Sequence, residues 1–177
     1  MIKVNGDLKK RNANLIKYIK VVRGINPFKL EYVDYMENKL IFTLIDKRII
    51  NILITELPQN ALADFNRIKK QIKNFNSLKD YLKINMKNIE DNIYEHFYYL
   101  DNFNFRIFKS KIMIYDFEVH YKGITKLRHF DFSMLNLNNY FNGEKIKEDN
   151  LISLFIHIIT NLLKEIIPST KEEGIEE

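Results

Sequence analysis

Apolar residues recur at helical spacing in several stretches of the chain. In residues 7–23 and again in residues 62–75 they fall every three or four positions, which predicts two amphipathic helices. Two shorter helices are expected after these, at residues 77–84 and 87–100, because Asn85 is interpreted as a helix breaker between them. The middle of the chain is therefore predicted to hold three consecutive helices.

Runs of β-branched and aromatic residues separate these helices and come in two groups of three. Glu37–Asn38 is the expected turn of the first hairpin. The run RIINILITEL is nearly continuously β-branched and apolar, which predicts a central strand. The six predicted strands are residues 29–35, 39–46, 48–56, 103–109, 111–121 and 125–133.

The order of these elements, α-βββ-ααα-βββ-α, defines the expected fold class. It is typical of an α+β protein in which two antiparallel three-stranded meanders, at about 29–56 and 103–133, pack with helices. The chain has 177 residues, which fits a single α+β domain over residues 1–168. Residues 169–177 hold one Lys and four Glu, which predicts an acidic, disordered tail.

The most hydrophobic stretch, LISLFIHIITNLLKEII, occupies residues 151–167 and predicts a last helix that Pro168 ends. Its apolar residues lie on nearly all sides, which is typical of a helix in a protein core. The stretch is shorter than the roughly 20 residues that a membrane span needs, so we expect no membrane span. His157 stands among aliphatic residues and is interpreted as a core histidine with its hydrogen bonds satisfied.

Composition excludes several classes of function. The chain has no cysteine, which excludes disulfides, zinc fingers and thiol nucleophiles and fits a reducing cytoplasm. The N-terminus lacks the apolar segment of a signal peptide, so a cytoplasmic location is expected. No glycine-rich phosphate loop and no hydrolase or zinc-protease motif occurs, so we expect no cofactor and favour a non-enzymatic role.

The charge allows for nucleic-acid binding. The 28 Lys and Arg against 23 Asp and Glu give a formal charge of +5, and basic residues cover the exposed sides of the predicted helices. Residues 75–97 resemble a helix-turn-helix in length and rhythm, although Glu90, Asp91 and Glu95 would repel phosphate. The candidate nucleic-acid-binding residues are Lys69, Lys70, Lys73, Lys87, Asn88 and Asn92.

The sequence DFEVHYKGITKLRHFD, residues 116–131, predicts a β-hairpin whose turn contains Gly123. A two-residue turn, Lys122–Gly123, separates polar from apolar residues and places Asp116 opposite His129. A three-residue loop would instead place Asp116 opposite Arg128 and form cross-strand ion pairs. The first register gathers the candidate catalytic residues Asp116, His129 and Asp131, and these with Glu118 and His120 are the candidate metal ligands.

The sequence leaves three functions to consider for this protein. A non-enzymatic protein-interaction or assembly role, through a protein partner or self-association, follows from the excess of aromatic and aliphatic residues and the lack of catalytic motifs. Nucleic-acid binding through the basic helices and the 75–97 segment is the alternative, and a metal-dependent or acid–base enzyme that uses the 116–131 hairpin is the third. Abundant Lys, Asn and Ile with scarce Ala and Gly are typical of proteins that phages or mobile elements encode in AT-rich genomes.

Overall fold

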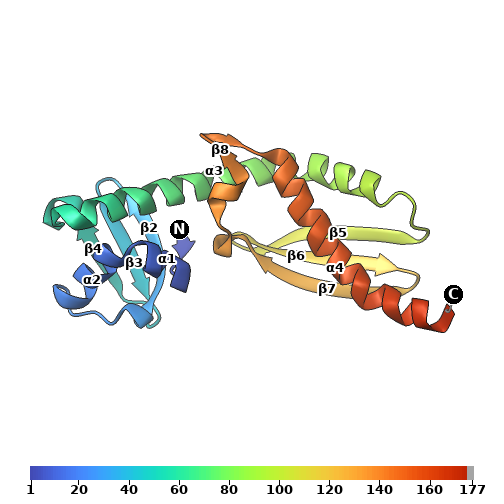
Figure 1. Cartoon of the computed structure of the whole chain (residues 1–177), viewed down its shortest axis with the longest axis horizontal. Coiled ribbons are helices and arrows are strands. Elements are labelled where there is room, and N and C mark those ends of the chain that lie inside the picture. The colour runs from blue at the N-terminus through green and yellow to red at the C-terminus, as the bar shows by residue number, and fades with distance from the viewer. Residues whose placement is uncertain (175–177) are drawn as a thin grey trace. The chain divides into compact units, whose positions relative to one another are not determined.

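The computed structural model describes the backbone of residues 1–174 and the side chains of residues 1–167. It confirms the α+β fold with antiparallel sheets. The chain divides into two compact units, Met1–Leu78 (unit 1) and Lys79–Glu177 (unit 2). Unit 1 combines one sheet with helices, and unit 2 combines a three-stranded sheet and a two-stranded one with helices (Figure 1). The expectation that residues 1–168 fold as a single domain stays a prediction.

Unit 1 begins with a two-residue strand and two short helices, β1 (Ile2–Lys3), α1 (Gly6–Arg11) and α2 (Ala13–Val21). The single helix predicted over residues 7–23 is therefore divided. The division falls at Asn12, which leaves the helical conformation at φ −121°, while its side-chain amide donates to the carbonyl oxygen of Leu8 over 2.7 Å. The same carbonyl oxygen also accepts the backbone N–H of Asn12 over 3.1 Å, so the buried asparagine closes the end of α1 with two hydrogen bonds.

The sheet of unit 1 contains four antiparallel strands in the order β1-β2-β3-β4. The predicted meander is present as β2 (Leu30–Met36), β3 (Lys39–Leu44) and β4 (Ile49–Leu53), and β1 adds a fourth strand. The prediction that the RIINILITEL run is a central strand was wrong, because β4 lies at the sheet edge. Its odd-numbered residues face outward, and Ile49 is 65% exposed.

The core of unit 1 lies between the inner face of this sheet and the helices. Leu40 and Phe42 of the sheet, with Leu15 and Ile19 of α2, are completely buried. Phe65, on the helix that closes the unit, is also completely buried. The other face of the sheet carries partly exposed residues, so the helices cover only the inner face.

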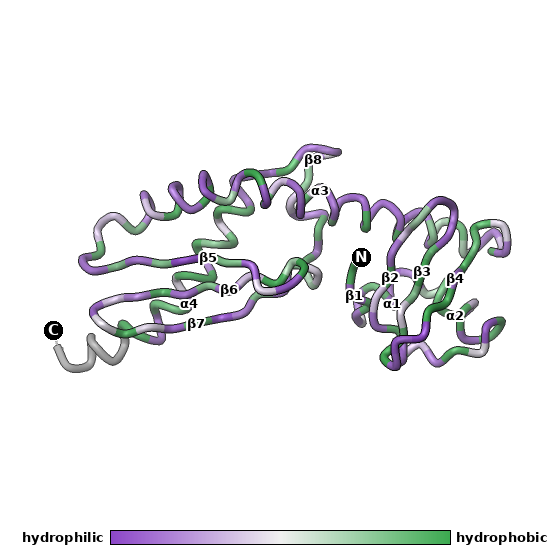
Figure 2. Tube along the Cα trace, turned by 180° about the vertical axis from the view of Figure 1, so that it is seen from behind, coloured by the Kyte–Doolittle hydropathy of each residue, from purple (hydrophilic) through white to green (hydrophobic). Residues whose placement is uncertain are grey.

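One helix, α3 (Gln59–His96), replaces the three helices predicted between residues 59 and 100. Residues 59–78 belong to unit 1 and residues 79–96 to unit 2. The predicted break at Asn85 was wrong because the asparagine side chain donates to the carbonyl oxygen of Tyr81 over 3.0 Å and is accommodated within the helix. The buried stripe also continues across this point, from Leu82 to Ile89. Figure 2 shows hydrophobic and hydrophilic residues following one another along α3.

Unit 2 contains the second meander as the sheet β5-β6-β7, with β5 (Phe103–Lys111), β6 (Ile114–Tyr121) and β7 (Ile124–Asp131). The inner face carries Phe117 and Val119, both completely buried. Polar side chains project from the opposite face. A two-stranded hairpin, β8 (Phe141–Asn142) and β9 (Lys145–Ile146), precedes the last helix.

The last helix, α4 (Glu148–Gly174), packs against β6 and β7. Leu151, Phe155 and Ile159 are completely buried, as predicted for a core helix. Residues 148–167 are also long and apolar enough to cross a membrane by length and composition alone. The prediction that Pro168 ends the helix was wrong, because α4 continues to Gly174. Of the predicted acidic tail, residues 175–177 lie outside the described residues.

Candidate functional site

The 116–131 hairpin has the first of the two predicted registers. Tyr121 pairs with Ile124, and Asp116 lies opposite His129, so the turn contains only Lys122 and Gly123. Both turn residues have positive φ, 52° and 82°, which is the conformation of a type I′ turn. The segregation of apolar from polar residues therefore determined the register, although it forces Lys122 into the left-handed region.

The five polar residues of this hairpin divide into separate pairs instead of forming one site. Asp116 accepts a hydrogen bond from the ring of His129. His120 lies 3.0 Å from Glu118, and its other ring nitrogen lies 2.9 Å from the Thr125 hydroxyl. Asp131 accepts hydrogen bonds from the backbone and the hydroxyl of Ser133, which cap the short 3₁₀ helix η3 (Phe132–Met134).

A metal ion needs three or more convergent ligands. Among the residues that the structure describes, no three His, Asp or Glu side chains are grouped in this way. Asp116 is buried, but the other members of the hairpin lie on the open face of the sheet. The catalytic and metal roles of these residues stay predictions, and the described geometry favours local hydrogen bonding.

The 75–97 segment is not a helix-turn-helix, because α3 runs through it without a break. The predicted nucleic-acid-binding residues consequently separate into two groups. Lys69, Lys70 and Lys73 lie on the part of α3 in unit 1, whereas Lys87, Asn88 and Asn92 lie on its part in unit 2. The Lys69 ammonium lies over the ring of Tyr35 at 4.9 Å from its centroid, and Asn92 bonds within the helix to the carbonyl oxygen of Asn88.

The formal charge is divided unequally between the two units. Unit 1 holds 15 Lys and Arg and 7 Asp and Glu, a formal charge of +8. Residues 79–168 hold 12 of each and are formally neutral, and residues 169–177 contribute −3. The whole basic excess of the chain therefore lies in unit 1.

A buried polar contact joins the basic helices of unit 1. The carboxylate of Asp64 on α3 accepts a hydrogen bond from the backbone N–H of Leu15 over 3.0 Å. It also pairs with Arg67 at 2.8 Å, and Arg67 donates to the backbone carbonyl oxygen of Arg11 and to the side chain of Asn12. These contacts join α1, α2 and α3, and the exposed basic residues of these helices are here called the basic helical surface: Lys10, Arg11, Lys17, Arg67 and Lys70.

A second polar network closes part of the free edge of β4. The N–H of Leu44 in β3 donates to the carbonyl oxygen of Arg48, so the backbone groups of the even-numbered residues point toward β3. The backbone groups of the odd-numbered residues of β4 therefore point to the free edge. Arg23 donates to the carbonyl oxygen of Asn51 over 2.9 Å, and Glu56 accepts from the N–H of Leu53 over 2.8 Å. An ion pair of 3.2 Å joins Arg23 to Glu56. Charged side chains on an edge strand oppose pairing with another strand.

The pKa of Glu56 in this network differs from that of an ordinary glutamate. Burial disfavours its ionised form, but hydrogen bonds from the Tyr18 hydroxyl and from the N–H of Leu53, with the charge of Arg23, outweigh that effect. The pKa of Glu56 is therefore lowered from its ordinary value of 4.5. The same hydrogen bond, reinforced by burial, raises the pKa of Tyr18.

His157 is exposed, so the interpretation of this residue as a core histidine was wrong. Its helix turns it away from the sheet, and its Nε2 lies 3.2 Å from the side-chain amide of Asn161, one turn further along α4. Many aromatic residues of unit 2 are buried, as Phe105 and Phe117 show. Tyr98, which follows α3, is 84% exposed.

Comparison of the chain with protein-family models, with curated proteins and with solved structures gives no significant match.

Proposed function

We propose that the protein binds nucleic acid through the basic helical surface of unit 1. The observation that carries this proposal is the charge division, because a unit of 78 residues with a formal charge of +8 is followed along the chain by 90 residues that are formally neutral. A compositional bias toward lysine would raise the charge of both units. Clustered Lys and Arg are the electrostatic footprint of phosphate binding.

The ion pairs of unit 1 do not neutralise all of the positive charge on the basic helical surface. Most of the acidic residues of the unit are held by a local cation, as Asp7 is by Arg11 and Asp64 by Arg67. Lys10, Lys17 and Lys70 are exposed and have no ion-pair partner among the described residues. Their charges are therefore available to phosphates without the breaking of an internal contact.

The expected mode of binding is contact with the nucleic-acid backbone. Reading of bases in the major groove needs an element that enters the groove, and the segment predicted to do so is part of a continuous helix. Lysine contacts to phosphate position a protein on the nucleic acid but carry no sequence information. We therefore expect binding that depends on salt more than on sequence.

Filter binding across salt concentrations tests this function. The full chain is titrated with duplex DNA, single-stranded DNA and RNA at 50 mM and 200 mM salt. About four phosphate contacts predict a loss of affinity of roughly 10²-fold between these concentrations. Absence of binding to all three at 50 mM salt would overturn the proposal, because the phosphate contribution is largest there.

A second candidate function, contact with another copy of this chain, is favoured by the aliphatic outer face of β4. Ile49 is 65% and Leu53 42% exposed, and Met36 on the same face is 54% exposed. Exposed aliphatic residues of a sheet face can meet an identical face in a two-fold arrangement, and Lys39 lies between Leu53 and Met36 on this one. A light-scattering mass of 21.3 kDa at high protein concentration would exclude this self-association.

A further inference from the structure

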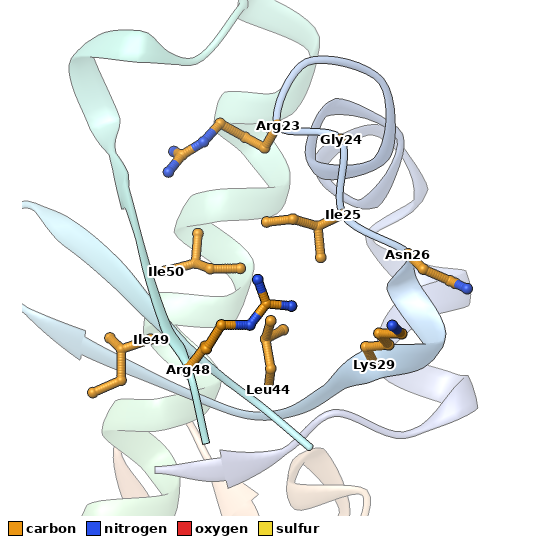
Figure 3. A pocket seen from close by; sticks show the side chains of 9 residues that line it. All are labelled: Arg23, Gly24, Ile25, Asn26, Lys29, Leu44, Arg48, Ile49 and Ile50. Carbon is orange, nitrogen blue, oxygen red and sulfur yellow. The ribbon is translucent and has the colours of Figure 1, made fainter. Parts of the chain in front are cut away.

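A pocket of about 430 Å³ lies in unit 1 beside the start of β4 (Figure 3). Its volume is in the range of small-molecule binding sites. The pocket is built by two segments that lie far apart in the sequence, residues 23–29 after α2 and residues 44–50 around the β3–β4 turn. Its lining includes three cations, Arg23, Lys29 and Arg48, and no carboxylate.

The chain geometry explains why apolar side chains form one side of this pocket. Gly24 adopts a φ of +65° and ends α2, and the N–H of Ile25 bonds to the carbonyl oxygen of Ile19 over 3.2 Å. Figure 3 shows the side chain of Ile25 directed toward those of Leu44 and Ile50. Leu44 is 1% and Ile50 9% exposed, and these residues form the apolar floor of the pocket.

The cations have different roles. Arg23 is engaged by Glu56 and by the β4 edge. Arg48 uses its Nε to pair with Asp46 at 2.9 Å, which leaves its terminal nitrogens directed into the pocket (Figure 3). The Lys29 ammonium makes no hydrogen bond with any described residue, although its charge, after the hydrogen bonds from Arg48, helps to lower the pKa of Asp46. Lys29 and Arg48 therefore both line the pocket and have N–H donors that make no hydrogen bond within the part of the protein that the structure describes.

We propose that this pocket binds a phosphate monoester whose anionic oxygens contact Lys29 and Arg48. A phosphate monoester carries a charge of about −1.5 to −2 at neutral pH, which matches two cations better than a carboxylate does. The group esterified to the phosphate lies on the apolar floor. This chemistry occurs in a free mononucleotide and at the 5′ end of a nucleic-acid chain. The inference does not depend on the basic helical surface, because no residue is shared.

Titration of the ¹⁵N-labelled full chain with adenosine monophosphate, followed by NMR, tests this site. We expect shifts at the amides of residues 23–29 and 44–50, and none with adenosine. Lys29→Gln and Arg48→Gln are each expected to weaken binding about tenfold or more, since each removes a hydrogen bond to a charged group. Lys39→Gln, at the opposite end of β3, is the matched control and should bind as the wild type does.

Shifts confined to other residues, or equal affinity in wild type, Lys29→Gln and Arg48→Gln, would overturn the proposal. Absence of binding of both inorganic phosphate and adenosine monophosphate at millimolar concentration would do the same.

A single-stranded oligonucleotide with and without a 5′ phosphate then identifies the source of the phosphate monoester. A preference for the phosphorylated end that Arg48→Gln abolishes assigns the site to nucleic-acid ends, and equal binding of both assigns it to a free phosphate monoester. Urea unfolding of each variant with the same midpoint as the wild type confirms that the variant is folded.

Discussion

The carboxylate of Asp64 lies 3.0 Å from the backbone nitrogen of Leu15, and both residues are buried. This contact caps the N-terminus of α2 from a different helix, because Asn12, which precedes α2, makes no side-chain capping bond. The same carboxylate fixes Arg67 beside the α1–α2 junction. One acidic residue therefore organises the helices that carry the basic surface.

Replacement of Asp64 by alanine should destabilise the protein by about 1–3 kcal/mol, because it removes a helix cap and leaves a buried N–H without an acceptor. Asp64→Asn keeps an acceptor for Leu15 and should cost less. Asp7→Ala, which breaks only the exposed pair with Arg11, is expected to change stability by at most about 0.5 kcal/mol. Urea denaturation measures all three. Equal midpoints for Asp64→Ala and Asp7→Ala would contradict this role.

Glu56 should make stability depend on acid pH. Its pKa is lower in the folded than in the unfolded chain, so its ionised form favours folding at neutral pH. This contribution is lost as pH falls through the folded pKa, below the ordinary value of 4.5. Between about pH 5 and pH 3, the free energy of unfolding should therefore fall more steeply in the wild type than in Glu56→Gln. Parallel curves for the two proteins would show that the network does not hold this carboxylate.

The phase of α3 near Asn85 is tested by two aliphatic residues that are two positions apart and lie on opposite sides of the helix. Leu82 is 0% exposed and Ile84 is 80% exposed. Leu82→Ala should cost about 2–5 kcal/mol, because it leaves a cavity in the core of unit 2. Ile84→Ala should change the stability by no more than about 0.5 kcal/mol. Similar losses for both substitutions in thermal or urea unfolding would mean that the helix is interrupted here.

The turn of the 116–131 hairpin places an ordinary residue in the left-handed conformation. Lys122 has a φ of 52°, which costs a side chain about 1 kcal/mol, whereas asparagine adopts it readily. Lys122→Asn should therefore raise the melting temperature. Gly123→Ala should lower it, because alanine at a φ of 82° is strained even though its Cβ meets no atom within 4 Å. The opposite order of the two variants would contradict the two-residue turn.

The strands of both meanders and the hairpin register could be predicted because alternation of apolar and polar residues fixes both. Two-residue strands such as β1 could not be predicted, since Ile2 and Lys3 become a strand only by pairing with β2. The break at Asn85 was predicted from the low helix propensity of asparagine. The buried stripe at Leu82 and Ile89 outweighs that propensity, which contributes only tenths of a kcal/mol.

The candidate sites depend on information that the local pattern does not hold. The basic residues of unit 1 are visible in the sequence, but their excess becomes clear only when the boundary near Leu78 separates them from a neutral unit. The pocket joins residues 23–29 to residues 44–50, which meet through the packing of a loop after α2 against a β-turn. No spacing within either segment indicates that contact.

Charge reversal at three lysines of each unit tests the central claim most directly. Lys10, Lys17 and Lys70 on the basic helical surface are replaced by Glu in one variant. Lys83, Lys87 and Lys109 of unit 2, which are also exposed, are replaced in the other. Both variants lose the same formal charge, and α3 carries a substituted lysine in each. We predict that filter binding at 50 mM salt is lost in the first variant and falls only slightly in the second. Equal loss in both, or greater loss in the second, would contradict binding through unit 1.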